Sequence, residues 1–327
     1  MPEKKTMDAV WLEDGRLQLR QDIPVPEPGQ DEALVAVTQA GICQTDLELI
    51  KGYSAFHGIP GHEFVGTVSA GPANLLGKRV VGEINACCGR CPTCRARAGC
   101  VRHCPERTVL GIAGRHGAMA EYLVLPSANL HEVADNLADD EAIFVEPLAA
   151  ALEIQEQVHL RPDQRVLVVG DGKLGLLVAQ SCSRTGAWVE VAGHHPERIG
   201  WFPGTAMRAC ADAGPDARSY DVAVECTGDA AGFDVALRAL RPGGTLIMKS
   251  TYTGRLTLDA AAVVVDEITL VGSRCGPFRP ALTLLASGQI QTGPLISARF
   301  TLDQAEAAFA RAAQRGVLKV ILGMKAE

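Results

Sequence analysis

The sequence RVLVVGDGKLG at residues 165–175 joins a run of apolar, mostly β-branched residues to a glycine-rich turn, and the helical segment LLVAQSCSRTG follows at 176–186. A strand, a G-x-G-x-x-G turn and a helix in this order are typical of a dinucleotide-binding βαβ unit. The first glycine would form the tight turn, the second would let the backbone approach a pyrophosphate, and the third would let the helix pack closely on the strand. A βα turn that binds no cofactor is the alternative. The predicted cofactor residues of this turn are Gly170, Gly172, Lys173, Leu174 and Gly175.

The end of the next predicted strand bears on which dinucleotide would bind. An NAD site commonly places an acidic side chain there, which accepts a hydrogen bond from the ribose 2′-hydroxyl. In this chain the position is Gly193, so we expect no carboxylate that would repel a 2′-phosphate. His194, His195 and Arg198 follow and would surround such a phosphate, which favours NADP over NAD. If the two histidines are only solvated loop residues, either dinucleotide would bind.

The chain after residue 165 alternates short apolar strands with segments of helical period. This alternation predicts a doubly wound α/β fold, in which helices cover both faces of a parallel sheet. Residues 33–124 instead carry short β-rich runs broken by glycine, which indicates a separate β-barrel-like domain. The predicted strands of the parallel sheet are 166–169, 188–192, 221–225, 245–249 and 268–272, and the tail is expected to return to the first domain through a helix at 280–286, a strand at 295–300, a helix at 302–313 and a strand at 318–322.

Length and composition limit the class of protein. A chain of 327 residues is long enough for two domains with separate cores. The net charge of −7 provides no basic field for nucleic acid, so a small molecule is the expected partner. The first 20 residues lack the apolar run of a signal peptide, and no later stretch has the roughly 20 apolar residues that span a bilayer. We therefore expect no membrane association and a cytoplasmic location.

Six of the eleven cysteines lie within residues 87–104. In a reducing compartment, clustered cysteines more often bind metal than form disulfides. Three thiolates separated by two residues each, closed by one more distant thiolate, are typical of a tetrahedral structural zinc site. The alternative is a cluster of free thiols. The predicted ligands are Cys88, Cys91, Cys94 and Cys104, with Cys87 and Cys100 as competitors for the fourth position.

A second set of metal-ligating residues is dispersed along the chain. It consists of Cys43, His62 with the neighbouring Glu63, and Glu146. Taken singly, such a cysteine is more often a small core residue, and such a histidine a hydrogen-bonded turn residue. Together, one thiolate, one imidazole and one carboxylate would give zinc three protein ligands and leave a fourth position open, as in catalytic sites.

These segments, in this order, closely resemble the zinc-dependent medium-chain dehydrogenases, the family of alcohol, polyol, threonine and sugar dehydrogenases. The resemblance implies an α/β chain in which a doubly wound Rossmann domain interrupts a GroES-like β-rich catalytic domain, with the active site in the cleft between them. It also implies two zinc ions per chain and a homodimer or homotetramer. The implied boundaries are residues 1–149 plus 275–327 for the catalytic domain, with a structural zinc lobe at 87–104, and 150–274 for the Rossmann domain.

Carried over by position, the resemblance assigns a role to each residue of the dispersed set. Cys43, His62 and Glu146 look like ligands of the catalytic zinc, and Glu63 like a carboxylate that can approach or exchange with the metal. Asp46 would be the acceptor that orients His62. The remaining implied residues are Thr45, whose hydroxyl would take the proton of the alcohol, and Thr227 and Ser250, which follow strands at the predicted cofactor cleft. For Thr227 and Ser250 the alternative is an ordinary turn at the end of a strand.

Glu48 departs from the commoner family pattern, which has a relay histidine at this point. A glutamate three residues after Thr45 is similar to the glucose-type sugar dehydrogenases. Glu48 would then accept a proton or bind a substrate hydroxyl, and a solvated surface carboxylate is the alternative. The implied reaction is hydride transfer between an alcohol, polyol or sugar and NAD(P), with NADP favoured. Two rivals are a non-catalytic zinc-ribbon protein that senses a nucleotide, and a zinc-free member similar to the quinone reductases.

Overall fold

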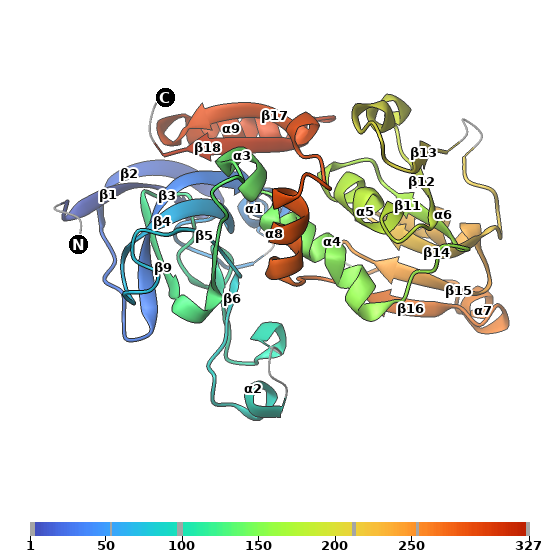
Figure 1. Ribbon diagram of the computed structural model, residues 1–327, viewed down its shortest axis with the longest axis horizontal. Helices are drawn as coiled ribbons and strands as arrows, with labels where there is room; N and C mark the ends of the chain where they lie inside the picture. Colours follow the sequence, from blue (N-terminus) through green and yellow to red (C-terminus); the bar gives the residue numbers. More distant parts are fainter. Residues whose placement is uncertain (1–3, 53, 97–100, 211–213, 253–254, 325–327) are drawn as a thin grey trace. The chain divides into compact units, whose positions relative to one another are not determined.

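The computed structural model describes residues 4–52, 54–96, 101–210, 214–252 and 255–324, and its contacts divide the chain into two units (Figure 1). The first unit comprises residues 1–146 and 295–327, and the second comprises residues 147–294. Within the described ranges, no helix combines the length and apolar character that crossing a bilayer requires.

The first unit is built on a seven-stranded, mainly antiparallel sheet. Its strands follow the order β10-β5-β4-β3-β18-β17, and β9 also pairs with β3. A β1-β2 hairpin and a small β6-β7-β8 sheet complete the unit. The elements of the first unit are β1 (Thr6–Glu13), β2 (Arg16–Pro24), β3 (Glu32–Ile42), α1 (Gln44–Ile50), β4 (Glu63–Ala70), β5 (Arg79–Gly82), β6 (Asn85–Ala86), α2 (Pro92–Ala96), η1 (Val101–His103), β7 (Thr108–Leu110), β8 (Gly114–Arg115), β9 (Tyr122–Pro126), η2 (Ser127–Asn129), β10 (Leu130–Glu132), α3 (Asp139–Ala142), β17 (Ile296–Thr301), η5 (Leu302–Gln304), α9 (Ala305–Ala312) and β18 (Lys319–Gly323).

The C-terminal strand returns to the start of the chain. β18 pairs antiparallel with β3, with Val320 opposite Ile42, and parallel with β17. Its residues are buried up to Leu322. Strand β18, near the end of the chain, therefore lies beside β3, the strand that leads to Cys43.

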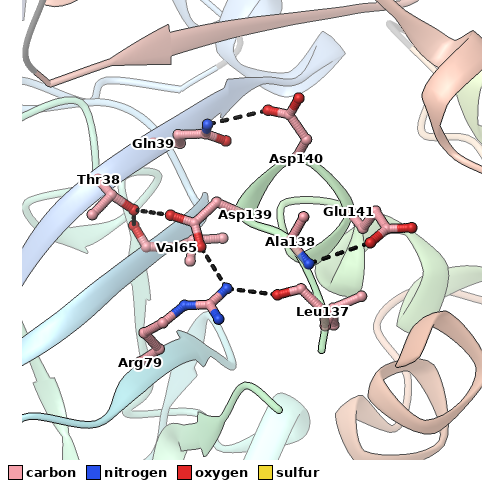
Figure 2. A network of polar contacts seen from close by, with 9 residues as sticks. All are labelled: Thr38, Gln39, Val65, Arg79, Leu137, Ala138, Asp139, Asp140 and Glu141. Carbon is pink, nitrogen blue, oxygen red and sulfur yellow. Dashed lines mark hydrogen bonds and ion pairs between the residues drawn. The ribbon is translucent and has the colours of Figure 1, made fainter. Parts of the chain in front are cut away.

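A polar network ties the short helix α3 to the sheet of the first unit (Figure 2). Arg79 donates from Nη2 to the Leu137 carbonyl at 2.7 Å and to Asp139 Oδ1 at 2.6 Å. The Thr38 hydroxyl donates to the other oxygen of Asp139 at 2.9 Å, and the Gln39 amide donates to Asp140 at 3.1 Å. These bonds fasten α3 to β3 and β5, and helix α4 (Val145–Gln157) begins three residues after α3 ends.

The second unit is the predicted doubly wound fold. Six parallel strands follow the order β13-β12-β11-β14-β15-β16, and the five predicted strands are all present. The sixth, β13, has only three residues and no apolar run, so the sequence analysis did not detect it. The elements of this unit are β11 (Arg165–Val169), α5 (Lys173–Ser183), β12 (Trp188–Ala192), η3 (Pro196–Trp201), β13 (Met207–Ala209), β14 (Tyr220–Glu225), α6 (Ala230–Ala239), β15 (Leu240–Met248), α7 (Ala260–Val265), β16 (Thr269–Gly272), α8 (Phe278–Ala286) and η4 (Gly293–Leu295), of which only Leu295 lies beyond the boundary.

Residues 275–294 lie in the second unit, whereas the sequence analysis placed them with the first domain. Two hydrogen bonds between Gln180 and Gln291 give the physical reason. The Gln180 amide donates to the Gln291 carbonyl at 3.0 Å, and the Gln291 N–H donates back to Gln180 Oε1 at 2.8 Å. The paired bonds fasten the chain after α8 to the helix α5 that follows the glycine-rich turn.

Candidate metal centres and dinucleotide site

Helix α2 lies in a separate lobe of the first unit (Figure 1). Cys88, Cys91, Cys94 and Cys104 converge in this lobe. The Sγ atoms of Cys91 and Cys94 lie 3.5 Å apart, those of Cys91 and Cys104 3.8 Å apart, and those of Cys104 and Cys88 3.5 Å apart. A disulfide would need about 2.05 Å, whereas four sulfurs bound at about 2.3 Å to one tetrahedral zinc lie about 3.8 Å from one another. The donor set and its spacing therefore fit a structural zinc. Cys87 is not part of this group, and Cys100 lies outside the described residues.

The electrostatics of the lobe suit metal binding. The Cys94 N–H donates to Cys91 Sγ at 3.4 Å, and this bond is the main cause that lowers the pKa of Cys91 to about 7. Burial and the neighbouring thiol of Cys91 raise the pKa of Cys94. One thiolate thus forms readily, and further thiolates beside it require a cation to offset their charge.

A second group forms where β3 ends and β4 begins. These strands pair so that Gly41 lies opposite Glu63, and Cys43 follows β3 as the residue that precedes helix α1. Gly61 turns the chain into β4 with a φ of +97°, a conformation that favours glycine. As a result one ligand atom each of Cys43, His62 and Glu63 lie within 4.8 Å of one another.

Asp46 connects the parts of this group from a completely buried position. Its Oδ2 accepts a hydrogen bond from the Cys43 N–H at 2.8 Å, and its Oδ1 accepts one from the Gly61 N–H at 3.2 Å. The same Oδ1 lies 3.4 Å from Nδ1 of His62. This side of the imidazole therefore faces Asp46, and the opposite ring nitrogen, Nε2, is the one that can serve as a ligand.

The charge around His62 favours a cation. Burial by itself lowers the pKa of His62, but the neighbouring Asp46 and Cys43 outweigh it, and the net pKa is raised well above the usual value. A buried site that stabilises positive charge in this way is suited to a metal ion.

Lys319 forms a buried ion pair with Glu63, and the sequence analysis did not identify it. Its ammonium contacts Oε2 of Glu63, and both side chains are almost completely inaccessible to solvent. The other oxygen, Oε1, is buried without a hydrogen-bond partner within the described structure. An unpartnered carboxylate oxygen beside a thiol and an imidazole is the donor that zinc accepts, so these residues fit a metal. The only signal in the sequence was one lysine within the apolar run LKVIL at 318–322.

The three other residues predicted to act at this centre, Thr45, Glu146 and Glu48, lie outside the group of three potential ligands. Thr45 Oγ1 is 3.9 Å from Cys43 Sγ. Glu146 is half-buried in the first turn of α4 and does not belong to the group of three, so its role as a ligand stays a prediction. Glu48 accepts hydrogen bonds at 2.9 Å from Lys51 and from Gln44, and the bond from Lys51 is the main cause that lowers its pKa. Its role in proton transfer also stays a prediction.

The glycine-rich turn has the shape that a pyrophosphate needs. Gly170 has a φ of +113°, and a Cβ at Gly175 would lie 1.9 Å from the Gly170 carbonyl oxygen. A Cβ at Gly172 would meet no atom within 4 Å, so the backbone is open to a ligand there. The turn therefore fits a dinucleotide. Lys173 and Leu174 form the first turn of helix α5.

The predicted residues at the ends of the strands have different environments. Thr227 follows β14, and both its N–H and its hydroxyl donate to Glu225, a completely buried carboxylate. Ser250 follows β15 and is half-buried. Beyond β12, His194 is exposed, His195 is half-buried and Arg198 is buried.

One expectation about this loop is wrong. The absence of an acid at Gly193 suggested that no carboxylate lies at the end of β12, but Asp171 occupies that space. Its Oδ2 accepts a hydrogen bond from the His195 N–H at 2.5 Å. The expectation rested on the residue at the end of the strand, whereas the carboxylate comes from the preceding glycine-rich turn.

Comparison with known proteins identifies the family. Residues 29–135 match the model of the alcohol dehydrogenase GroES-like domain. D-arabinitol dehydrogenase 1 of Uromyces fabae is 28% identical over 92% of each chain, and L-threonine 3-dehydrogenase of Serratia proteamaculans is 27% identical over 97% of each. A protein of Sinorhizobium meliloti 1021, described as a zinc-binding dehydrogenase and solved with bound NADP, superimposes with a TM-score of 0.88 at 30% identity, over 98% of this chain and all of the other. The chain therefore belongs to the zinc-containing, NAD(P)-dependent medium-chain dehydrogenases, a family of enzymes.

Proposed function

We propose that this enzyme interconverts an alcohol, with polyols and sugars as the preferred class, and the corresponding carbonyl compound, and that it uses NADP in preference to NAD. The observation that carries the proposal is the buried group of Cys43, His62 and Glu63, held together by Asp46. Relatives that act on D-arabinitol and L-threonine support a substrate with neighbouring hydroxyl or polar groups.

Each residue of the group has a defined task in this reaction. Cys43 and His62 would hold a zinc ion through Sγ and Nε2, with Glu63 and Glu146 as the carboxylates available to it. When bound, the zinc supplies a Lewis acid that polarises the oxygen of the substrate. Asp46 keeps the imidazole in the required orientation. Thr45, whose hydroxyl lies 3.9 Å from Cys43 Sγ, would accept the proton of the alcohol while it passes its own hydroxyl proton on to solvent.

The second unit would hold the dinucleotide. The backbone of Gly170, Gly172 and Gly175 receives the pyrophosphate at the N-terminus of α5. His194, His195 and Arg198 would meet the 2′-phosphate of NADP, and the NADP bound to the Sinorhizobium meliloti protein supports this preference. The other residues proposed to contact the cofactor are Lys173, Leu174, Gly193, Thr227 and Ser250.

Zinc analysis combined with a cofactor-by-substrate screen tests the proposed function. We expect two zinc ions per chain and reduction of NADP that depends on an added alcohol, polyol or aldose. One zinc per chain and no turnover across the panel would favour a non-catalytic zinc-ribbon protein. Turnover of quinones by protein stripped of the second zinc would favour a member similar to the quinone reductases.

We also propose that the enzyme is cytoplasmic and forms a homodimer or homotetramer. The described cysteines are free, which fits a reducing compartment. Among the described residues, strand β16 has a sheet neighbour on one side only, and Val264, Val265 and Leu270 on α7 and β16 are exposed. An open strand edge beside apolar side chains is suited to pairing with a second copy.

Light scattering of the variant V264D/V265D tests this assembly. Because Val264 and Val265 are 74% and 79% exposed, two aspartates there should not disturb the fold but should block an apolar interface. We expect the wild-type mass to be that of a dimer or tetramer and the variant mass to fall to half of it or less. A monomeric wild type, or a variant of unchanged mass, would contradict the proposed surface.

A further inference from the structure

The glycine-rich turn and the end of β12 lie side by side in the second unit. In the parallel pair β11–β12, Val169 is opposite Ala192, and the Gly170 N–H donates to the Ala192 carbonyl at 2.8 Å. Asp171, which follows Gly170, and Gly193, which follows Ala192, are therefore neighbours in space. A Cβ on Gly193 would lie 2.3 Å from Cγ and 2.6 Å from Oδ2 of Asp171. The carboxylate thus fills the space that a side chain of residue 193 would take.

Asp171 is held in this position by the segment that follows β12. Its Oδ2 accepts from the His195 N–H at 2.5 Å, and its backbone carbonyl accepts from Nη1 of Arg198 at 2.8 Å. The same Nη1 lies 3.8 Å from Oδ1. Both side chains are mostly buried, with exposed fractions of 12% for Asp171 and 6% for Arg198. The carboxylate is therefore a fixed negative charge at the end of the second strand.

We propose that Asp171 is a specificity-determining residue, which takes the place of the acidic residue missing from β12 and limits the preference of the enzyme for NADP. A carboxylate at this end of the strand accepts a hydrogen bond from the 2′-hydroxyl of NAD and repels the 2′-phosphate of NADP. Arg198 and the two histidines act in the opposite direction. This inference rests on the proposed binding of a dinucleotide at the turn.

The same geometry assigns a reason to Gly193. Any larger residue would collide with Cβ or Cγ of Asp171, which are close to the backbone and cannot move far. Gly193 is thus required by the carboxylate of the turn, whether or not a phosphate binds. A single G193D change would displace Asp171 before it could act on the cofactor.

Substitution D171N tests the proposal, with calorimetric dissociation constants for NADPH and NADH measured without substrate. Asparagine keeps the shape and can still accept from the His195 N–H, but it removes the charge. We expect binding of NADPH to tighten by about tenfold relative to NADH, as the loss of one nearby repulsion predicts. The matched control is D163N, which removes one charge from an exposed position before β11 and should leave the ratio within twofold.

Three results would overturn the proposal. If the ratio of NADPH to NADH dissociation constants changes no more in D171N than in D163N, the carboxylate does not act on the 2′ position of the cofactor ribose. A loss of NADPH binding relative to NADH would show that Asp171 only supports Arg198. The double variant D171G/G193D moves the carboxylate from the turn to the end of the strand. We expect its ratio of NADPH to NADH dissociation constants to return from the D171N value toward the wild-type value. If the ratio of dissociation constants in the double variant equals that in D171N, the proposal is also contradicted.

The wild-type measurement separates this inference from the proposed function. Wild-type enzyme that binds neither dinucleotide would overturn both. Wild-type enzyme that binds NADH more tightly than NADPH would contradict only the proposed NADP preference, because the direction of the change in D171N still tests the role of Asp171.

Discussion

Replacement of Cys43 by serine is expected to lower kcat/KM by at least about a thousandfold, because a neutral hydroxyl is a poor ligand for the zinc that the proposed reaction requires. The fold should remain, since the Cys43 N–H would still donate to Asp46 and serine is a favourable residue before a helix. Steady-state kinetics and zinc analysis check this expectation. We expect the variant to keep one zinc per chain, in the four-cysteine lobe.

The matched control for this variant is C210S. Cys210 is half-buried in the second unit and belongs to neither group of potential ligands among the described residues. Its replacement should leave two zinc ions and most of the activity. Retention of the wild-type rate in C43S, or an equal loss in C210S, would reject the role assigned to Cys43.

Replacement of Lys319 by methionine is expected to lower the free energy of unfolding by about 3–5 kcal/mol, because it leaves the buried carboxylate of Glu63 without its counter-ion. Methionine has a length similar to that of lysine, so lost packing contributes little. Urea denaturation followed by tryptophan fluorescence measures this change in the free energy of unfolding.

The double variant E63Q/K319M provides the control, because it removes both charges. A neutral amide is less costly to bury than an unpaired carboxylate, so the double variant should regain part of the stability lost in K319M. A K319M protein within about 1 kcal/mol of wild type would show that the pair does not stabilise the fold.

The parts of the molecule that follow from local patterns were predictable from the sequence. The central strands β11 and β14 of the parallel sheet are almost completely buried, so each is a short apolar run in the sequence, with Val166 and Val222 in the core. Cys88, Cys91 and Cys94 lie within seven residues, and their spacing alone indicates a metal site.

The parts that depend on contacts between distant residues were not predictable. Lys319 meets Glu63 across 256 positions of sequence, because β18 pairs with β3 and β3 pairs with β4, the strand that begins at Glu63. Asp171 reaches the space over Gly193 because two strand ends are in register, which no periodicity in either segment shows.

Anomalous diffraction at the zinc edge, from crystals of the zinc-loaded enzyme, tests the shared ion at Cys43 and His62 most directly. We predict two peaks per chain, one among the four cysteines and one at about 2.3 Å from Cys43 Sγ and about 2.0–2.1 Å from His62 Nε2. A peak at the four cysteines alone, with none in bonding distance of Cys43 and His62, would contradict the account.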